Sequence, residues 1–305
     1  MSKRDFLSVD DLSIEELREL LDRAAEVKEQ PEKAAETLAG KQVALIFEKP
    51  STRTRVSFEV AVTSMGGHAL VLRGDELQIG RGETVSDTGT VLSRFVDCIV
   101  IRTFGHDRLL ELAEAASVPV VNALSDFSHP CQALADMQTI MEQKKDPAGM
   151  VLAYVGDGNN VAHSLMFAGT KLGMHVRVAT PGGHQPDAVV AERCAQIAAE
   201  TGGSTVVTTV VAEAVTGADV LYTDVWASMG QEAETEQRRS TFQGYSIDRA
   251  TLDLAAADAI VMHCLPAYRG EEISADAIDG LQSVVWDQAE NRMHAQKALL
   301  AWLLA

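Results

Sequence analysis

The fold is decided by a stretch that reads VALIFEKPSTRTRVSFEVAVTSM over residues 43–65. It opens with a continuous apolar run, Val43–Phe47, and passes through polar residues into Val56–Met65, which has the length and period of a helix. A continuous apolar run bounded by turn residues is typical of a parallel strand covered on both faces. The stretch therefore predicts one strand–turn–helix unit of an α/β fold.

The same pattern repeats along the chain. Segments of helical period separate the apolar runs, as at Asp107–Ala116, Ser164–Leu172 and Asp187–Glu200. The other predicted strands are Ala69–Leu72, Cys98–Ile101, Val118–Val121, Met150–Val155, Val176–Ala179, Thr205–Val207, Val220–Thr223, Ile260–Met262 and Val284–Trp286. We therefore expect two doubly wound parallel-sheet α/β domains with the active site in the cleft between them.

A polar stretch at residues 143–149 (QKKDPAG) is typical of a linker and predicts the domain boundary. The expected domains are residues 1–143 and 149–288. A last helix is expected near residues 289–305, and the sequence allows it to pack back onto the first domain. Near the N-terminus, Ser13 and Glu16 form a capping-box pattern ahead of an apolar helix face.

Composition limits the classes of function. The chain has 305 residues and a net charge of −18, which excludes nucleic acid and anionic membranes as partners. The acidity fits either ordinary solubility or a host with high internal salt. We find no signal segment or membrane span. The cysteines are scattered without a metal-ligand spacing, so we expect a reduced, cytoplasmic protein.

The most informative polar segment is Ser51–Arg55, between a predicted strand and a predicted helix. Backbone N–H groups at a helix N-terminus bind anions, and arginine matches phosphate oxygens with two parallel hydrogen bonds. The alternative is a Ser/Thr helix cap with two solvated arginines. The segment indicates an anion site at the carboxyl end of its strand.

Two other polar residues also follow predicted strands. Arg102 closes a buried strand and either answers an anionic ligand or lies in a surface loop. His129 precedes Pro130, and it is either structural or a hydrogen-bond donor to a carbonyl oxygen.

The segment Gly156–Asn160 (GDGNN) has part of a dinucleotide-binding pattern. That pattern needs a third Gly or Ala, where this chain has Val161, and an acidic residue after the next strand, where it has Thr180. A nicotinamide-dependent dehydrogenase is therefore disfavoured. The remaining interpretations are a tight turn, or an asparagine that binds a polar substrate.

Cys264 has two interpretations, a buried small hydrophobic residue or a nucleophile. Nothing near it in the sequence provides a Cys–His–Asp order. The neighbouring His263 would point to the opposite side of a strand.

Together these motifs resemble the aspartate/ornithine carbamoyltransferase family. Ser51–Arg55 (STRTR), His129–Gln132 (HPCQ) and His263–Pro266 (HCLP) occur in the family's order and at similar spacings. The ornithine branch is indicated by Asp224 with the following VWASMG, and by Cys264, where the aspartate branch has proline. The resemblance implies transfer of the carbamoyl group of carbamoyl phosphate to the δ-amine of L-ornithine, giving L-citrulline and phosphate.

The resemblance also implies roles for individual residues. Residues 1–143 become the carbamoyl phosphate-binding domain and residues 149–288 the ornithine-binding domain. The implied carbamoyl phosphate contacts are Ser51, Thr52, Arg53, Thr54, Gln78, Arg102, His129, Gln132, Cys264, Leu265 and Arg292, and the implied ornithine contacts are Asn160, Asp224, Ser228 and Met229. Arg53, Arg102, His129 and Cys264 are the implied catalytic residues. Gln78 would serve a neighbouring subunit's site, which implies a trimer or an assembly of trimers. The resemblance implies neither a metal nor an organic cofactor.

Several alternatives stay open at this level. The acceptor could be aspartate, putrescine or an acylated ornithine, although Asp224 argues against an anionic acceptor. A non-catalytic binding protein is a rival from another class, which a turnover assay would separate. The sequence does not decide between arginine synthesis and arginine breakdown.

Overall fold

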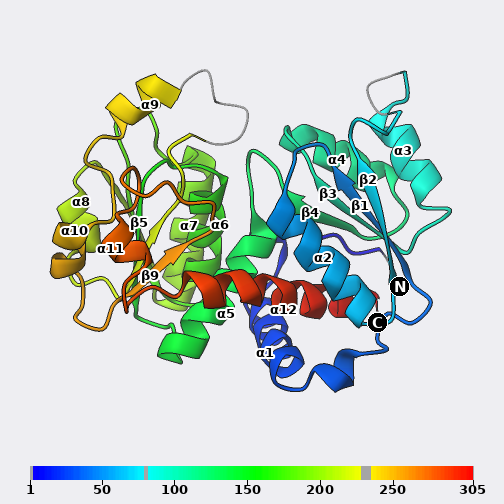
Figure 1. Ribbon diagram of the computed structural model, residues 1–305, viewed down its shortest axis with the longest axis horizontal. Helices are drawn as coiled ribbons and strands as arrows, with labels where there is room; N and C mark the ends of the chain where they lie inside the picture. The colour runs from blue at the N-terminus through cyan, green and yellow to red at the C-terminus, as the bar shows by residue number, and fades with distance from the viewer. Residues whose placement is uncertain (1–2, 79–81, 228–234, 305) are drawn as a thin grey trace. The chain divides into compact units, whose positions relative to one another are not determined.

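A computed structural model describes residues 3–78, 82–227 and 235–304. By their internal contacts the residues divide into two compact units (Figure 1). Unit 1 comprises Met1–Gln138 and Asn291–Ala305, and unit 2 comprises Thr139–Glu290. The boundaries fall inside two helices, α5 (Pro130–Lys144) and α12 (Val285–Leu304).

Unit 1 contains a parallel four-stranded sheet in the order β2-β1-β3-β4. Its strands are β1 (Gln42–Phe47), β2 (His68–Arg73), β3 (Cys98–Arg102) and β4 (Val120–Leu124), and its helices include α1 (Ile14–Glu29), α2 (Thr52–Ser64), α3 (Val85–Leu92) and α4 (His106–Ala115). The chain runs outward from β1 to β2 and then crosses to β3 on the other side of β1. The strand order therefore reverses between β1 and β3, at the register pair Phe47–Arg102.

Unit 2 contains a parallel five-stranded sheet in the order β7-β6-β5-β8-β9. Its strands are β5 (Val151–Val155), β6 (His175–Ala179), β7 (Ser204–Thr208), β8 (Val220–Thr223) and β9 (Ile260–His263). Its helices are α6 (Asn160–Lys171), α7 (Ala188–Thr201), α8 (Val211–Val215), α9 (Thr235–Thr241), α10 (Arg249–Leu254) and α11 (Ala275–Ile278). Here the order reverses between β5 and β8, where Val155 pairs with Thr223.

Each sheet is the centre of its own apolar core, as parallel strands covered on both faces require. In unit 1, Ile46 and Ile101 pack with Leu109 and Leu112 of α4. In unit 2, Val155, Leu221 and Val261 pack in one cluster with Ala214 and Ala218, which lie between β7 and β8. The predicted fold class, two doubly wound parallel-sheet units, is confirmed.

Most of the predicted elements form within a few residues of their expected bounds. The capping box of Ser13 and Glu16 starts α1, and Leu17, Leu20, Leu21 and Ala24 are buried as expected. The predicted strand Val284–Trp286 is wrong, because α12 begins at Val285. Its apolar residues do approach β9, since the Val284 N–H donates to the Val261 carbonyl at 3.0 Å. The chain then turns at once into a helix, which a short apolar run does not reveal.

Candidate functional site

The predicted anion loop lies at the strand-order reversal of unit 1. Ser51 is the N-cap of α2, and its hydroxyl accepts a hydrogen bond from the Thr54 N–H at 3.3 Å. The N–H groups of the first helical turn have no intrahelical acceptor, so those of Thr52 and Arg53 suit an anion. Within the described residues Arg53 makes no hydrogen bond or ion pair, and it is half-buried. The loop therefore offers helix N-terminal N–H groups and a guanidinium that has no ion pair among the described residues, a combination that suits an anion.

Buried polar residues from distant parts of unit 1 lie beside this loop. Arg292 donates from Nη2 to the Thr54 hydroxyl at 2.6 Å, and both side chains are buried. Burial, with Arg292 and Arg102 nearby, lowers the pKa of His129 well below its usual value. His129 is therefore a neutral imidazole at physiological pH, able to donate a hydrogen bond without adding charge. Gln132 is buried and donates to Asp136 at 2.8 Å.

The strand-order reversal of unit 2 carries an acidic centre. Asp224 follows β8 and is 6% exposed. Its Oδ1 accepts from the Cys264 thiol at 3.0 Å, and its Oδ2 accepts from the Asn159 amide at 3.0 Å. Asn159 is also the N-cap of α6, where its amide oxygen accepts from the Val161 N–H at 2.9 Å. The carboxylate is thus held by two donors and suits an ammonium group.

The thiol geometry favours one interpretation of Cys264. Its Sγ is the donor in a hydrogen bond to the Asp224 carboxylate, and a neighbouring negative charge disfavours the thiolate that a nucleophile needs. The other cysteines are free and buried, and burial raises the pKa of the Cys131 thiol to about 12. A nucleophilic cysteine is not supported by this arrangement.

One group of potential metal ligands exists within the described part of the chain. Asp224, His263 and Cys264 offer ligand atoms within 4.8 Å of one another. Both ring nitrogens of His263 are already bonded, Nδ1 to the Leu265 N–H at 2.8 Å and Nε2 to Glu272 at 3.1 Å. An ion would have to displace one of these bonds before His263 became a ligand.

The glycine-rich turn after β5 has a packing explanation. A Cβ on Gly158 would lie 2.3 Å from the Pro186 nitrogen, so the backbone near residue 185 occupies the space beside this glycine. The Gly158 N–H donates to the His184 carbonyl at 2.9 Å. In a dinucleotide-binding turn, that glycine instead lets the backbone approach a pyrophosphate. The turn is therefore closed by its own chain, which agrees with the sequence argument against a dinucleotide-binding turn.

The remaining predicted residues are distributed as follows. Gln78 is exposed, and Asn160 is half-buried in the first turn of α6. Leu265 is half-buried and has a φ of 58°. Ser228 and Met229 lie outside the described residues. Unit 1 thus brings Ser51, Thr54, Arg102, His129 and Arg292 together, while unit 2 brings Asp224 and Cys264 together with Asn159.

Sequence reasoning missed three residues that organise these groups. Asn159 was passed over for its neighbour Asn160, although an asparagine before a helical segment is an N-cap signal. Arg238 donates to the Trp226 carbonyl and to Asp157, a contact between segments far apart in sequence. Glu272 is a fully buried carboxylate paired with His263, and no local pattern marks it.

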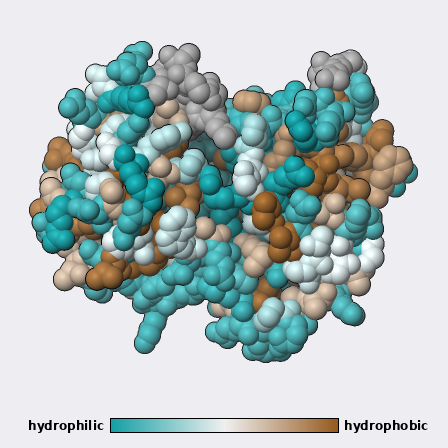
Figure 2. Space-filling model, viewed as in Figure 1, coloured by the Kyte–Doolittle hydropathy of each residue, from teal (hydrophilic) through white to brown (hydrophobic). Residues whose placement is uncertain are grey.

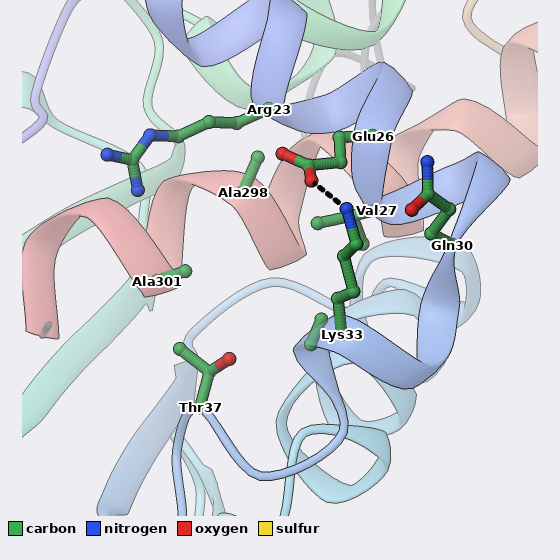
Figure 3. A pocket seen from close by; sticks show the side chains of 9 residues that line it. Arg23, Glu26, Val27, Gln30, Lys33, Thr37, Ala298 and Ala301 are labelled. Atoms are coloured by element: carbon green, nitrogen blue, oxygen red, sulfur yellow. Dashed lines mark hydrogen bonds and ion pairs between the residues drawn. The ribbon is translucent and has the colours of Figure 1, made fainter.

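A pocket in unit 1 lies apart from all the predicted site residues. Figure 3 shows its lining between α1, the turn that follows α1, and α12. The Lys33 ammonium pairs with Glu26 at 2.9 Å across one wall, and Ala298 and Ala301 form the other. The cations of this pocket already have carboxylate partners, since Arg23 pairs with Glu19. The pocket therefore offers less to an anion than the α2 loop does.

Hydrophilic residues cover much of the face seen in Figure 2, with smaller hydrophobic patches between them. Among the described helices, none combines the length and apolar character needed to cross a bilayer.

Doubly wound α/β proteins bind ligands outside the carboxyl ends of their strands, where the strand order reverses, and this chain carries an arginine-containing loop and a buried carboxylate at two such places. Comparison with models of known protein families identifies the family of both units. Residues 4–142 match the carbamoyl-P binding domain of aspartate/ornithine carbamoyltransferase, and residues 148–303 match the Asp/Orn binding domain. The chain belongs to the aspartate/ornithine carbamoyltransferase family.

Individual relatives agree with the family models. An ornithine carbamoyltransferase of Parafrankia sp. is 56% identical over 100% of this chain and 97% of its own length. The structure of ornithine carbamoyltransferase from Pyrococcus furiosus is 54% identical, with a TM-score of 0.96 over 99% of this chain and 97% of that chain. An acetylornithine transcarbamylase complexed with acetylcitrulline is 32% identical, with a TM-score of 0.89 over 99% of both chains.

Proposed function

We propose that this enzyme transfers the carbamoyl group of carbamoyl phosphate to the δ-amine of L-ornithine, giving L-citrulline and phosphate. The observation that carries the choice of acceptor is the buried Asp224 carboxylate, which is bonded by Asn159 and Cys264. An ornithine α-ammonium pairs with such a carboxylate, and relatives that are 56% and 54% identical to this chain are named ornithine carbamoyltransferases.

The residues of unit 1 bind and polarise carbamoyl phosphate in this proposal. Ser51, Thr52, Arg53 and Thr54 hold the phosphate with hydroxyl, guanidinium and helix N-terminal donors. Arg102, Arg292 and the neutral His129 donate to the carbamoyl oxygen, where negative charge develops. Gln132 contacts the carbamoyl amide, as does Leu265 of unit 2. These residues lower the barrier by placing charge and donors, and no protein nucleophile is needed.

The residues of unit 2 bind the acceptor. Asp224, Asn160, Ser228 and Met229 hold the α-ammonium and α-carboxylate of ornithine, and Cys264 orients Asp224 through its thiol. The δ-amine attacks the carbamoyl carbon, the new C–N bond forms, and the bond from carbon to the phosphate oxygen breaks. The departing phosphate takes the proton that the amine loses. The domains of this proposal are residues 1–143, with the last helix, and residues 149–288.

Acylated ornithine is the second candidate acceptor, because one relative is an acetylornithine transcarbamylase. An acylated α-nitrogen carries no positive charge. It would leave the buried Asp224 facing a neutral amide, which costs more than pairing with an ammonium. Aspartate is opposed by the same carboxylate, since like charges repel. Asp224 thus favours free ornithine over both.

The test is a panel of acceptors offered with carbamoyl phosphate, with the ureido product detected by colour reaction and mass spectrometry. Ornithine, N-acetylornithine, putrescine and aspartate are compared at equal concentration. We expect citrulline from ornithine, with kcat/KM at least about tenfold above that of putrescine, which lacks the α-carboxylate. Equal values for N-acetylornithine and ornithine would refute the acceptor assignment while leaving carbamoyl transfer intact.

We further propose a trimer, or an assembly of trimers, in which Gln78 reaches a neighbouring subunit's phosphate. Gln78 is exposed and therefore accessible to a partner. Inactive Gln78→Ala and inactive Arg53→Ala proteins are mixed, dissociated and reassembled. Hybrid trimers should regain activity, because some sites then carry neither change. Hybrids that form without any activity would contradict shared sites.

The four free cysteines fit a reducing compartment, and we propose a cytoplasmic location.

A further inference from the structure

Glu272 is a fully buried carboxylate in the segment that precedes α11. Its Oε1 accepts from His263 Nε2 at 3.1 Å and from the Tyr268 N–H at 2.6 Å. Both the Glu272 and the His263 side chains are 0% exposed. The Glu272 carbonyl accepts from the Ile247 N–H at 2.9 Å, and the neighbouring Ile273 lies in the apolar core. Burying a carboxylate costs free energy unless hydrogen bonds to the protein stabilise it, as those from His263 and the Tyr268 N–H do here.

The hydrogen bonds of His263 define its tautomer. Nδ1 faces the Leu265 N–H at 2.8 Å, and a backbone N–H can only donate. Nδ1 must therefore be the acceptor, and the ring proton lies on Nε2, which donates to Glu272. The His263 backbone N–H is held separately, by the Gln288 amide oxygen at 2.9 Å. Glu272 thus fixes which nitrogen of His263 is free to accept.

The bond from Leu265 to His263 holds an unusual backbone. Leu265 has a φ of 58°, in the left-handed region that non-glycine residues seldom adopt. Cys264 lies between His263 and Leu265, and its thiol donates to Asp224 at 3.0 Å. Loss of the Leu265–His263 bond would let the backbone relax from the left-handed region and move the thiol.

We propose that Glu272 is a positioning residue for carbamoyl transfer: through the tautomer of His263 it holds the Cys264–Leu265 turn, and with it the thiol that orients Asp224. The inference rests on the proposed function for its kinetic consequence. Its geometric content, that Glu272 keeps Cys264 in place, stands apart from the reaction. What matters is the hydrogen bond that the Glu272 carboxylate accepts, more than its charge.

Two small substitutions separate the hydrogen bond from the charge. Glu272→Gln removes the charge, but its amide oxygen takes the place of Oε1 and still accepts from His263. Glu272→Asp keeps the charge, but its shorter side chain draws the carboxylate away from His263. We expect Glu272→Asp to lower kcat/KM for ornithine by about tenfold or more and Glu272→Gln by less than about threefold. The dissociation constant for carbamoyl phosphate alone, measured by calorimetry, should change by less than about twofold in both.

A second readout needs no activity. The rate at which iodoacetamide alkylates Cys264 is followed by peptide mass spectrometry, with the fully buried Cys194 of unit 2 as the internal control for general opening. Alkylation of Cys264 should rise several-fold in Glu272→Asp relative to Cys194, and stay near the wild-type rate in Glu272→Gln. The reverse order of the two variants, in either readout, overturns the proposal. A wild type that makes no citrulline would end the proposed function, while the alkylation order would still decide the role of Glu272.

Discussion

The anion loop of unit 1 and the acidic centre of unit 2 lie at equivalent places in their sheets, but their charged groups are opposite in sign and differ in how the protein bonds them. Each lies where the strand order of its sheet reverses. In the loop, Arg53 is half-buried and makes no ion pair among the described residues. In the acidic centre, both oxygens of Asp224 already accept hydrogen bonds from the protein.

The difference follows from the cost of burial. A partly exposed guanidinium and the N–H groups of a helix N-terminus can be hydrated by solvent in the absence of a ligand, so they need no protein partner. A carboxylate at 6% exposure has little water, and it must be bonded by the protein before the ligand arrives. The loop is thus kept open for its ligand, and the acidic centre is organised in advance.

Removing the Arg53 guanidinium tests most directly whether the loop differs from the acidic centre in the way described. Arg53→Ala should lower kcat/KM for carbamoyl phosphate by about 10²–10³, since a charged donor to the leaving phosphate is lost. Steady-state kinetics measure it. Arg55→Ala is the matched control on the same helix, because Arg55 is 49% exposed and pairs with Glu59 at 3.6 Å. An equal loss in both variants would mean that the loop has no special cation.

A substitution in the acidic centre should affect the kinetics with ornithine, where the loop substitution affects those with carbamoyl phosphate. Asp224→Asn keeps the shape and removes the charge, so KM for ornithine should rise about 10- to 100-fold, equivalent to about 1.5–3 kcal/mol for a charge-assisted bond. Binding of carbamoyl phosphate alone, followed by calorimetry, should stay nearly unchanged. An unaltered KM for ornithine would remove Asp224 from the acceptor site.

Advance organisation of Asp224 can be tested through its partner. Asn159→Ser keeps an N-cap oxygen for α6 but removes the amide that donates to Asp224. We expect kcat/KM for ornithine to fall about three- to tenfold, with the melting temperature almost preserved. A large fall in melting temperature with unchanged kinetics would make Asn159 a cap and nothing more.

The last prediction is a modest dependence of stability on pH that arises from His129 in unit 1. The pKa of His129 is lowered by burial and by two arginines, so the unfolded chain binds a proton more readily than the folded one below about pH 6.5. Stability therefore falls as the pH drops from about 6.5 towards the lowered pKa, by at most about 1.4 kcal/mol per pH unit from this residue. His129→Gln should flatten the fall in melting temperature between about pH 7 and pH 5.5. His68→Gln, at an exposed position on β2, is the control, and a profile for His129→Gln that matches the wild type would contradict a buried neutral histidine.

The sequence predicted the two sheets well because parallel strands buried on both faces leave continuous apolar runs, as Val43–Phe47 does. It also pointed to the strand ends, since Ser51, Arg102 and Asp224 all follow such runs. It could not choose Asn159 over Asn160, because only the exact start of α6 decides which amide meets Asp224. Nor could it find Glu272, whose partner His263 is recognised only once the chain has folded.

The return of α12 to unit 1 has a consequence for how the chain is made. Asn291–Ala305 complete unit 1, where Arg292 bonds Thr54, Lys28 bonds Asn291 at 2.7 Å, and Arg4 stacks on Trp302 at 4.0 Å. Nascent domains usually fold in order from the N-terminus. Here the earlier part of unit 1 must wait for Asn291–Ala305, so a ribosome that stalls before Asn291 leaves Thr54 without the Arg292 hydrogen bond and α1 without the helix that packs beside it. A stop codon within α12 would therefore harm unit 1, most of which is synthesised well before that helix.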